Sequence, residues 1–156
     1  MVLASGAALA DTQTIALTQV GNTWTAGFDD THNISGAFTD TFTFTPANLA
    51  GLVDVGFLNI ASTKVAAITF TSASIDGIPI PVFSTPGSSL SHFSSGAILS
   101  TYLSDGFVLK ISGTSGGNGS YGGLFNLSVV PEPASYAMMA GGLALLGFMA
   151  RRRKQE

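Results

Sequence analysis

Hydrophobic and polar residues alternate along most of this 156-residue chain. The clearest case is the segment 38–45, where Phe38, Phe42 and Phe44 share one face with Asp40 and threonines occupy the other face. Successive side chains of a β-strand point to opposite faces, so this alternation predicts a strand with one buried face. Because no helical period is evident between residues 11 and 130, the pattern favours an all-β body.

Two Asp-Gly dipeptides, Asp76-Gly77 and Asp105-Gly106, predict hairpins, because a type I′ turn needs positive φ at both central residues. Pro79 and Pro81 lack backbone donors on the same lateral side and therefore suggest an edge strand. We expect strands over 12–20, 23–28, 38–45, 52–60, 65–75, 78–83, 97–104, 107–112 and 121–129. Their spacing predicts an antiparallel, jelly-roll-like β-sandwich.

The uncharged run from Ala134 to Ala150 is 17 residues long and ends directly before a basic segment, 151–154. At about 1.5 Å per residue a helix of this length reaches roughly 25 Å, near the thickness of about 30 Å of a hydrocarbon core. Cations beside a membrane span stay in the cytoplasm. We therefore expect a single C-terminal transmembrane α-helix at 134–150, with a buried core helix as the alternative.

The first ten residues, MVLASGAALA, form a short apolar run that ends in Ala8-Leu9-Ala10. This is the small-residue cleavage pattern of a secretory signal peptide, although a positively charged start and a longer apolar stretch are missing. We interpret residues 1–10 as a truncated or partial signal peptide that is cleaved before Asp11, with a buried first strand or helix as the alternative. The body then spans 11–129 and the tail 130–156.

Composition and charge exclude several functions. The chain has no Cys, which rules out a disulfide framework, a thiolate zinc site and a cysteine nucleophile. Residues 11–130 contain seven Asp but only two Lys. An acidic body lacks the basic face that follows phosphates, so we expect no nucleic-acid partner.

The tail carries a recognisable combination of motifs. Pro131, Glu132 and Pro133 stand directly before the uncharged run, and Arg151, Arg152 and Arg153 follow it. Two prolines favour an extended segment without neighbouring structure, which a processing enzyme can grip. Together these parts resemble the PEP-CTERM sorting signal of bacteria that make exopolysaccharide. The resemblance implies recognition and cleavage by exosortase, an inner-membrane intermediate with a cytoplasmic C-terminus, and delivery to the cell surface or beyond.

Two body segments extend this resemblance. The pattern of Phe38, Asp40 and Phe42, and the later stretch 107–123 (FVLKISGTSGGNGSYGG), resemble the FxDxF branch of PEP-CTERM proteins. Members of this branch are viewed as exported surface or matrix proteins without established catalytic activity. The resemblance therefore implies a structural role for Phe38, Asp40 and Phe42.

Asp40 shares its strand face with three phenylalanines, so its carboxylate must be paired or hydrogen-bonded if that face is buried. One interpretation is a structural pin to backbone donors, hydroxyls or Lys110. The other is a calcium site in which Asp29, Asp30 and Asn33 supply further oxygens, although no calcium-loop spacing is present. We expect no cofactor.

Two segments resemble catalytic motifs without their context. Residues 113–117 fit the G-x-S-x-G pattern and residues 117–122 fit G-x-G-x-x-G, but no helix is expected after either. His32 and His92 are expected to be solvated loop residues. Glutamate occurs only in the tail, which leaves only Asp pairs for glycosidase chemistry. The sequence therefore indicates a protein that is not an enzyme.

The function expected from these observations is that of an exported structural protein of the surface or matrix, associated with exopolysaccharide or biofilm. The alternative is a carbohydrate-binding module that stacks sugars on Trp24, Tyr102 and Tyr121. Exposed, coplanar rings would favour the module, and burial of all three would favour the structural protein. A small hydrolase is a third hypothesis, which needs a His within reach of a Ser or Asp in a cleft.

Overall fold

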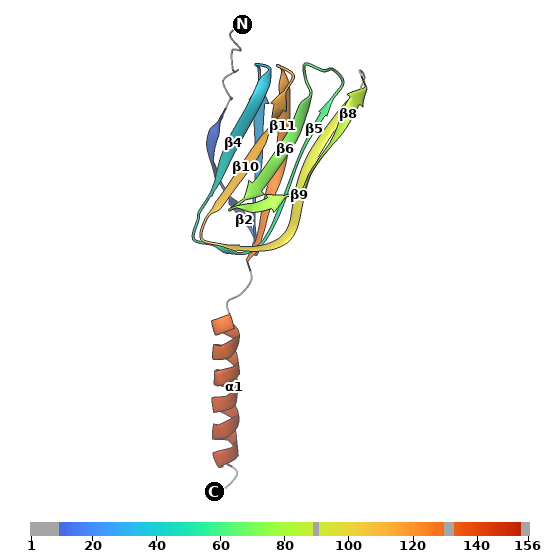
Figure 1. The fold of residues 1–156 in the computed structure, drawn as a ribbon. Helices are drawn as coiled ribbons and strands as arrows, with labels where there is room; N and C mark the ends of the chain where they lie inside the picture. Colours follow the sequence, from blue (N-terminus) through green and yellow to red (C-terminus); the bar gives the residue numbers. More distant parts are fainter. Residues whose placement is uncertain (1–9, 89–90, 130–132, 154–156) are drawn as a thin grey trace.

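Eleven strands and one helix form the part of the chain that the computed structural model describes, residues 10–88, 91–129 and 133–153 (Figure 1). The first sheet has the strand order β1 (Thr12–Ala16), β4 (Gly36–Thr45), β10 (Phe107–Ser115), β6 (Ile68–Ile75) and β7 (Ile78–Ile80). The second sheet has the order β2 (Thr18–Val20), β3 (Thr23–His32), β11 (Gly119–Val129), β5 (Ala50–Ala61), β9 (Ser91–Ser104) and β8 (Val82–Ser88). The predicted all-β sandwich is confirmed.

The two sheets pack face to face over a core rich in phenylalanine. Phe42 and Phe44 of β4 are fully buried, as the alternation of this segment predicts. Phe44 stacks on Phe125 of β11 with ring centroids 4.3 Å apart, and Phe42 lies 4.9 Å from Phe28 of β3. Side chains from both sheets therefore interlock, and apolar burial of this kind is the main stabilising term of the fold.

Strand pairing is antiparallel except at one edge of the first sheet. There β1 runs parallel to β4, with Thr12 opposite Thr41 and Ala16 opposite Thr45. The expected single strand 12–20 is instead two strands that belong to different sheets. Leu17 lies between them, buried, and its backbone N–H donates to the Thr45 carbonyl at 2.7 Å. The chain thus crosses from one sheet to the other at Leu17.

One predicted hairpin is confirmed and the other is wrong. Asp76 and Gly77 have φ of 47° and 83° and join β6 to β7, whose edge position fits Pro79. Asp105 and Gly106 also have positive φ, but β9 and β10 belong to different sheets. A positive-φ dipeptide reverses the chain locally and does not decide which sheet the next strand joins.

The helix α1 (Pro133–Arg153) includes the uncharged run 134–150, and its large apolar side chains are exposed, among them Met138 and Leu143. The predicted helix is confirmed. Among the described residues, no helix is both long enough and apolar enough to cross a membrane, so the predicted transmembrane span is not confirmed.

Candidate functional site

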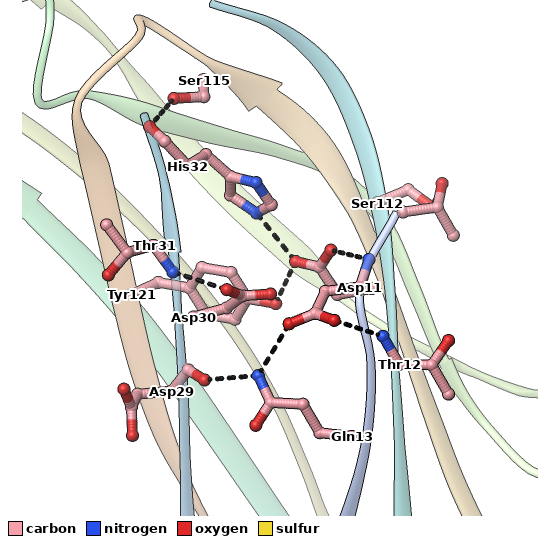
Figure 2. Close-up of polar contacts among 12 residues, drawn as sticks. Asp11, Thr12, Gln13, Asp29, Asp30, Thr31, His32, Ser112, Ser115 and Tyr121 are labelled. Carbon is pink, nitrogen blue, oxygen red and sulfur yellow. Dashed lines mark hydrogen bonds and ion pairs between the residues drawn. The ribbon is translucent and has the colours of Figure 1, made fainter. Parts of the chain in front are cut away.

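Asp40 is the centre of a buried polar cluster between the two sheets, and its partners His32 and Tyr121 are labelled in Figure 2. His32 Nε2 lies 2.8 Å from Asp40 Oδ2, and the Tyr121 hydroxyl donates to the same oxygen at 2.7 Å. The backbone N–H of Asp11 donates to Asp40 Oδ1 at 3.2 Å. The carboxylate is therefore satisfied by three groups, as a buried charge requires.

Neighbouring strands place these groups. Asp40 comes from β4 in the first sheet, whereas His32 ends β3 and Tyr121 lies near the start of β11 in the second. Asp30 stands directly opposite Tyr121 in the β3–β11 register. Asp30 and His32 are two residues apart and so share the inward face of β3. The cluster therefore links the two sheets by polar contacts within a largely apolar interior.

Aromatic packing fixes the cluster. The His32 ring stacks on Phe38 with centroids 4.0 Å apart, and Tyr121 lies 6.0 Å from Phe38 in a nearly parallel arrangement. Burial raises the pKa of Tyr121 far above its ordinary value, and its hydrogen bond to Asp40 raises it further. Tyr121 is therefore a protonated hydrogen-bond donor to Asp40 across the physiological pH range.

Asp30 lies beside this cluster and is only partly paired. Its Oδ1 accepts a hydrogen bond from the Thr31 backbone at 2.7 Å. Its Oδ2 is buried and has no hydrogen-bond partner among the described residues. Burial raises the pKa of Asp30, the Thr31 N–H lowers it, and the nearby Asp40 carboxylate raises it again. The negative charge of Asp30 is thus unfavourable in this position.

The same residues have the composition of a cation site. One oxygen each of Asp30 and Asp40 and a ring nitrogen of His32 lie within 4.8 Å of one another. A pocket of about 300 Å³ is lined by two of these residues, Asp30 and His32, together with Asp11 and others. Two carboxylates and one imidazole suit a zinc-like ion better than calcium, which prefers six to eight oxygens.

The structure brings together only some of the calcium ligands expected from the sequence. It brings Asp30 and Asp40 together but leaves Asp29 out, since Asp29 is exposed and its carboxylate points away from Asp11 and Asp30 (Figure 2). Adjacent residues on a strand face opposite ways, so Asp29 and Asp30 cannot both point inward. His32 joins the two carboxylates instead.

Two expectations about basic residues need correction. Lys110 is exposed on β10, opposite Thr41, and forms no ion pair with Asp40 among the described residues. His32 is 5% exposed rather than solvated in a turn. His92 lies in β9, half-buried, with Nε2 2.8 Å from the Ile68 carbonyl oxygen. Phe28 faces the core, and side chains two and four residues further along a strand lie on the same face. The sequence could therefore have placed Asp30 and His32 in the interior.

The two glycine motifs lie in strands and turns. Ser115 ends β10, and its hydroxyl donates to the backbone carbonyl of His32 at 3.3 Å, not to the imidazole. Strand β11 begins at Gly119, so no helix follows either motif. The strand–turn–helix geometry that a nucleophile elbow or a dinucleotide site needs is therefore not formed here.

The three aromatic residues proposed for sugar stacking occupy different environments. Tyr121 is buried in the Asp40 cluster, and Trp24 is half-buried against the core. Tyr102 alone is well exposed, at 60%, on β9. The three rings therefore do not form a common exposed platform.

The tail is the second candidate site. Residues 129–154 match the family model described as the PEP-CTERM protein-sorting motif. No curated protein matches the chain. Pro133 opens α1 and Arg153 ends it, whereas Pro131 and Glu132 lie outside the described residues, as does most of the predicted signal peptide. The match covers the tail alone, so the FxDxF subtype, with its Phe38, Asp40 and Phe42, stays a prediction.

Proposed function

We propose that this chain, whose residues 129–154 match the PEP-CTERM protein-sorting motif, is exported and processed through exosortase, and that its β-sandwich works outside the cell as a structural component of the surface or extracellular matrix. We assign it to a matrix of exopolysaccharide or biofilm type. The observation that carries the proposal is the boundary between the two regions: β11 ends at Val129, where the sorting motif begins. A cut near residues 131–133 therefore delivers the whole sandwich.

The sandwich is suited to delivery without its tail. Its buried apolar core ends with Leu127 and includes no residue of α1. Because the tail contributes nothing to this core, its removal leaves the packing of both sheets unchanged. An extracellular domain without disulfides must be stable through its core alone, and a body of about 120 residues is large enough for that.

The proposed role is not enzymatic. The polar groups of the Asp40 cluster bond to one another, and the Ser115 hydroxyl is engaged by a backbone carbonyl. These contacts favour a structural purpose for groups that could otherwise act as base or nucleophile. The absence of a common platform for Trp24, Tyr102 and Tyr121 likewise favours the structural protein over the carbohydrate-binding module.

The outer face of the second sheet offers a surface for assembly. A groove of about 450 Å³ runs across β5, β9 and β11, with Gly56, Gly122 and Gly123 among its lining residues. Exposed leucines flank it, namely Leu58, Leu99 and Leu124. Exposed apolar patches of this kind are typical of surfaces that contact other molecules. Such a surface supports a protein that functions by association.

Cell fractionation with and without exosortase tests the proposal. With the enzyme, the body should be found in the matrix or the medium, and without it the body should remain cell-associated. Replacing Pro131, Glu132 and Pro133 by alanine should reproduce the exosortase-free distribution, while Pro79→Ala in β7 serves as the matched control. A body that partitions identically in both strains, or a gene deletion that leaves biofilm mass unchanged, would contradict the proposed role.

A further inference from the structure

The Asp40 cluster gathers negative charge without a matching cation. The carboxylate of Asp30 lies near those of Asp40 and Asp11, and Asp11 and Asp30 both line the pocket beside the cluster. Among the described residues, His32 is the basic side chain that contacts Asp40, at 2.8 Å, and an imidazole is a cation only when protonated. The two lysines of the body, Lys64 and Lys110, are both exposed. Asp40 is buried and Asp30 is partly buried. Gathering carboxylates at such a place is unfavourable unless a positive group joins them.

The backbone nitrogen of Asp11 is the group best placed to become that cation. It already donates to Asp40 Oδ1 at 3.2 Å. The Asp11 carbonyl accepts from Thr41 N at 2.8 Å, and its side chain accepts from Thr12 N at 2.8 Å. Figure 2 shows Asp11 beside the cluster formed by His32 and Tyr121. The first strand begins at the next residue, so this nitrogen is held in place by β1 and β4.

An independent observation in the sequence points to the same nitrogen. Ala8-Leu9-Ala10 has the small-residue pattern at which a signal peptidase cuts, and Asp11 is the next residue. Hydrolysis of the Ala10–Asp11 peptide bond consumes one water. It leaves a carboxylate on Ala10 and an amino group on Asp11. An α-amino group has a pKa near 8 and takes up a proton at neutral pH, so the new terminus is cationic.

We propose that cleavage between Ala10 and Asp11 converts this backbone donor into an ammonium that forms a partly buried ion pair with Asp40. A charge-assisted hydrogen bond is shorter and roughly twice as strong as a neutral one. The ammonium also has three N–H donors, and Asp30 Oδ2 is an acceptor without a partner in the same pocket. Maturation thus completes the cluster, and the sandwich gains stability only once the leader is gone. The inference rests on the export proposed above.

Two chains that differ by one residue test the ion pair directly. One starts at Asp11 and the other at Ala10, both end at Glu156, and each is released from a removable tag by a protease that leaves no extra residue. One added residue moves the amine by about 3.8 Å. We expect the chain that starts at Asp11 to melt about 5 °C higher. Asp40→Asn in both chains should abolish the difference. Equal melting temperatures, or a difference that survives Asp40→Asn, would overturn the inference.

A chemical measurement covers the case in which Asp40→Asn does not fold. An amine in a buried ion pair is protected from an acylating reagent, so the terminus at Asp11 should react about tenfold more slowly than the terminus at Ala10. Equal rates would argue against the pair. Both measurements use purified chains, so a failure of sorting in cells leaves them unaffected. The N-terminus of the exported body, read by mass spectrometry, should be Asp11, and any other N-terminus would overturn the proposed cleavage.

Discussion

Strand β4 and helix α1 both carry large apolar side chains, but only β4 buries them. Phe42 and Phe44 are 0% exposed, whereas Met138 and Leu143 are 79% and 63% exposed. Since burial of apolar surface stabilises the folded state, β4 contributes to stability and α1 does not. The difference shows that the sandwich folds through its own core, while the tail carries the sorting signal.

Removal of residues 130–156 should have the largest effect on sorting and almost none on folding. Without the sorting motif, exosortase-dependent processing should be lost completely, because its signal occupies 129–154. The melting temperature of the sandwich should change by no more than about 2 °C. Fractionation and calorimetry of the same variant measure both effects. A sharp drop in melting temperature would mean that the tail packs on the body.

Phe44→Ala should lower the free energy of unfolding by about 3–5 kcal/mol. Phe44 is fully buried and stacks on Phe125, so the substitution leaves a cavity between the sheets. The matched change in α1, Met138→Ala, should alter stability by less than about 0.5 kcal/mol, because the side chain is exposed. Urea denaturation of both variants compares the two regions directly. Similar losses in the free energy of unfolding would contradict the view that β4 stabilises the fold and α1 does not.

Asp40→Asn should lower the free energy of unfolding by about 2 kcal/mol. The amide keeps one acceptor oxygen but places an NH2 group against donors such as Tyr121 and the Asp11 nitrogen. Asp29→Asn, a change at an exposed neighbour of the cluster, provides the control and should remain within about 0.5 kcal/mol of the original protein. If the two variants were equally stable, the cluster would contribute nothing to the sandwich.

Asp76→Asn should have the smallest effect, and the size of that effect should depend on pH. Burial raises the pKa of Asp76 above 3.8, partly offset by the Val108 N–H that donates to it. The folded state therefore holds the proton more tightly, and stability declines as the pH rises from below 3.8 through the raised pKa. Asparagine keeps the acceptor and tolerates the positive φ of this turn. The variant should gain up to about 2 °C relative to the original protein above this window and nothing below it. A gain in melting temperature that is independent of pH would show that the titration of Asp76 is not its cause.

Most of the fold could be predicted from alternation, and the arrangement of the sheets could not. The alternate positions of Phe38, Phe42 and Phe44 predicted the buried face of β4 correctly, and Asp76-Gly77 predicted a hairpin. Asp105-Gly106 forms the predicted turn, but the strands on either side of it belong to different sheets. Local backbone chemistry does not determine which sheet a strand joins. The parallel pairing of β1 with β4 depends on long-range contacts that no local pattern records.

The candidate site was only partly predictable for the same reason. The sequence identified Asp40 as a buried carboxylate that needs partners, and its position between phenylalanines carried that inference. His32 and Tyr121 come from two strands of the opposite sheet, 8 and 81 residues away along the chain. Their approach follows from how the sheets stack, which the alternation of single strands does not encode. The tail needed no such contacts, because its motif is contiguous in the sequence.

The intact mass of the protein recovered outside exosortase-positive cells shows whether the tail is removed before the sandwich acts. We expect a species that contains the whole sandwich through Val129 and lacks the basic end 151–154. Cells without exosortase should yield no such species. Recovery of an external protein that still carries Arg151, Arg152 and Arg153 would contradict the account, since the tail would then be part of the working protein.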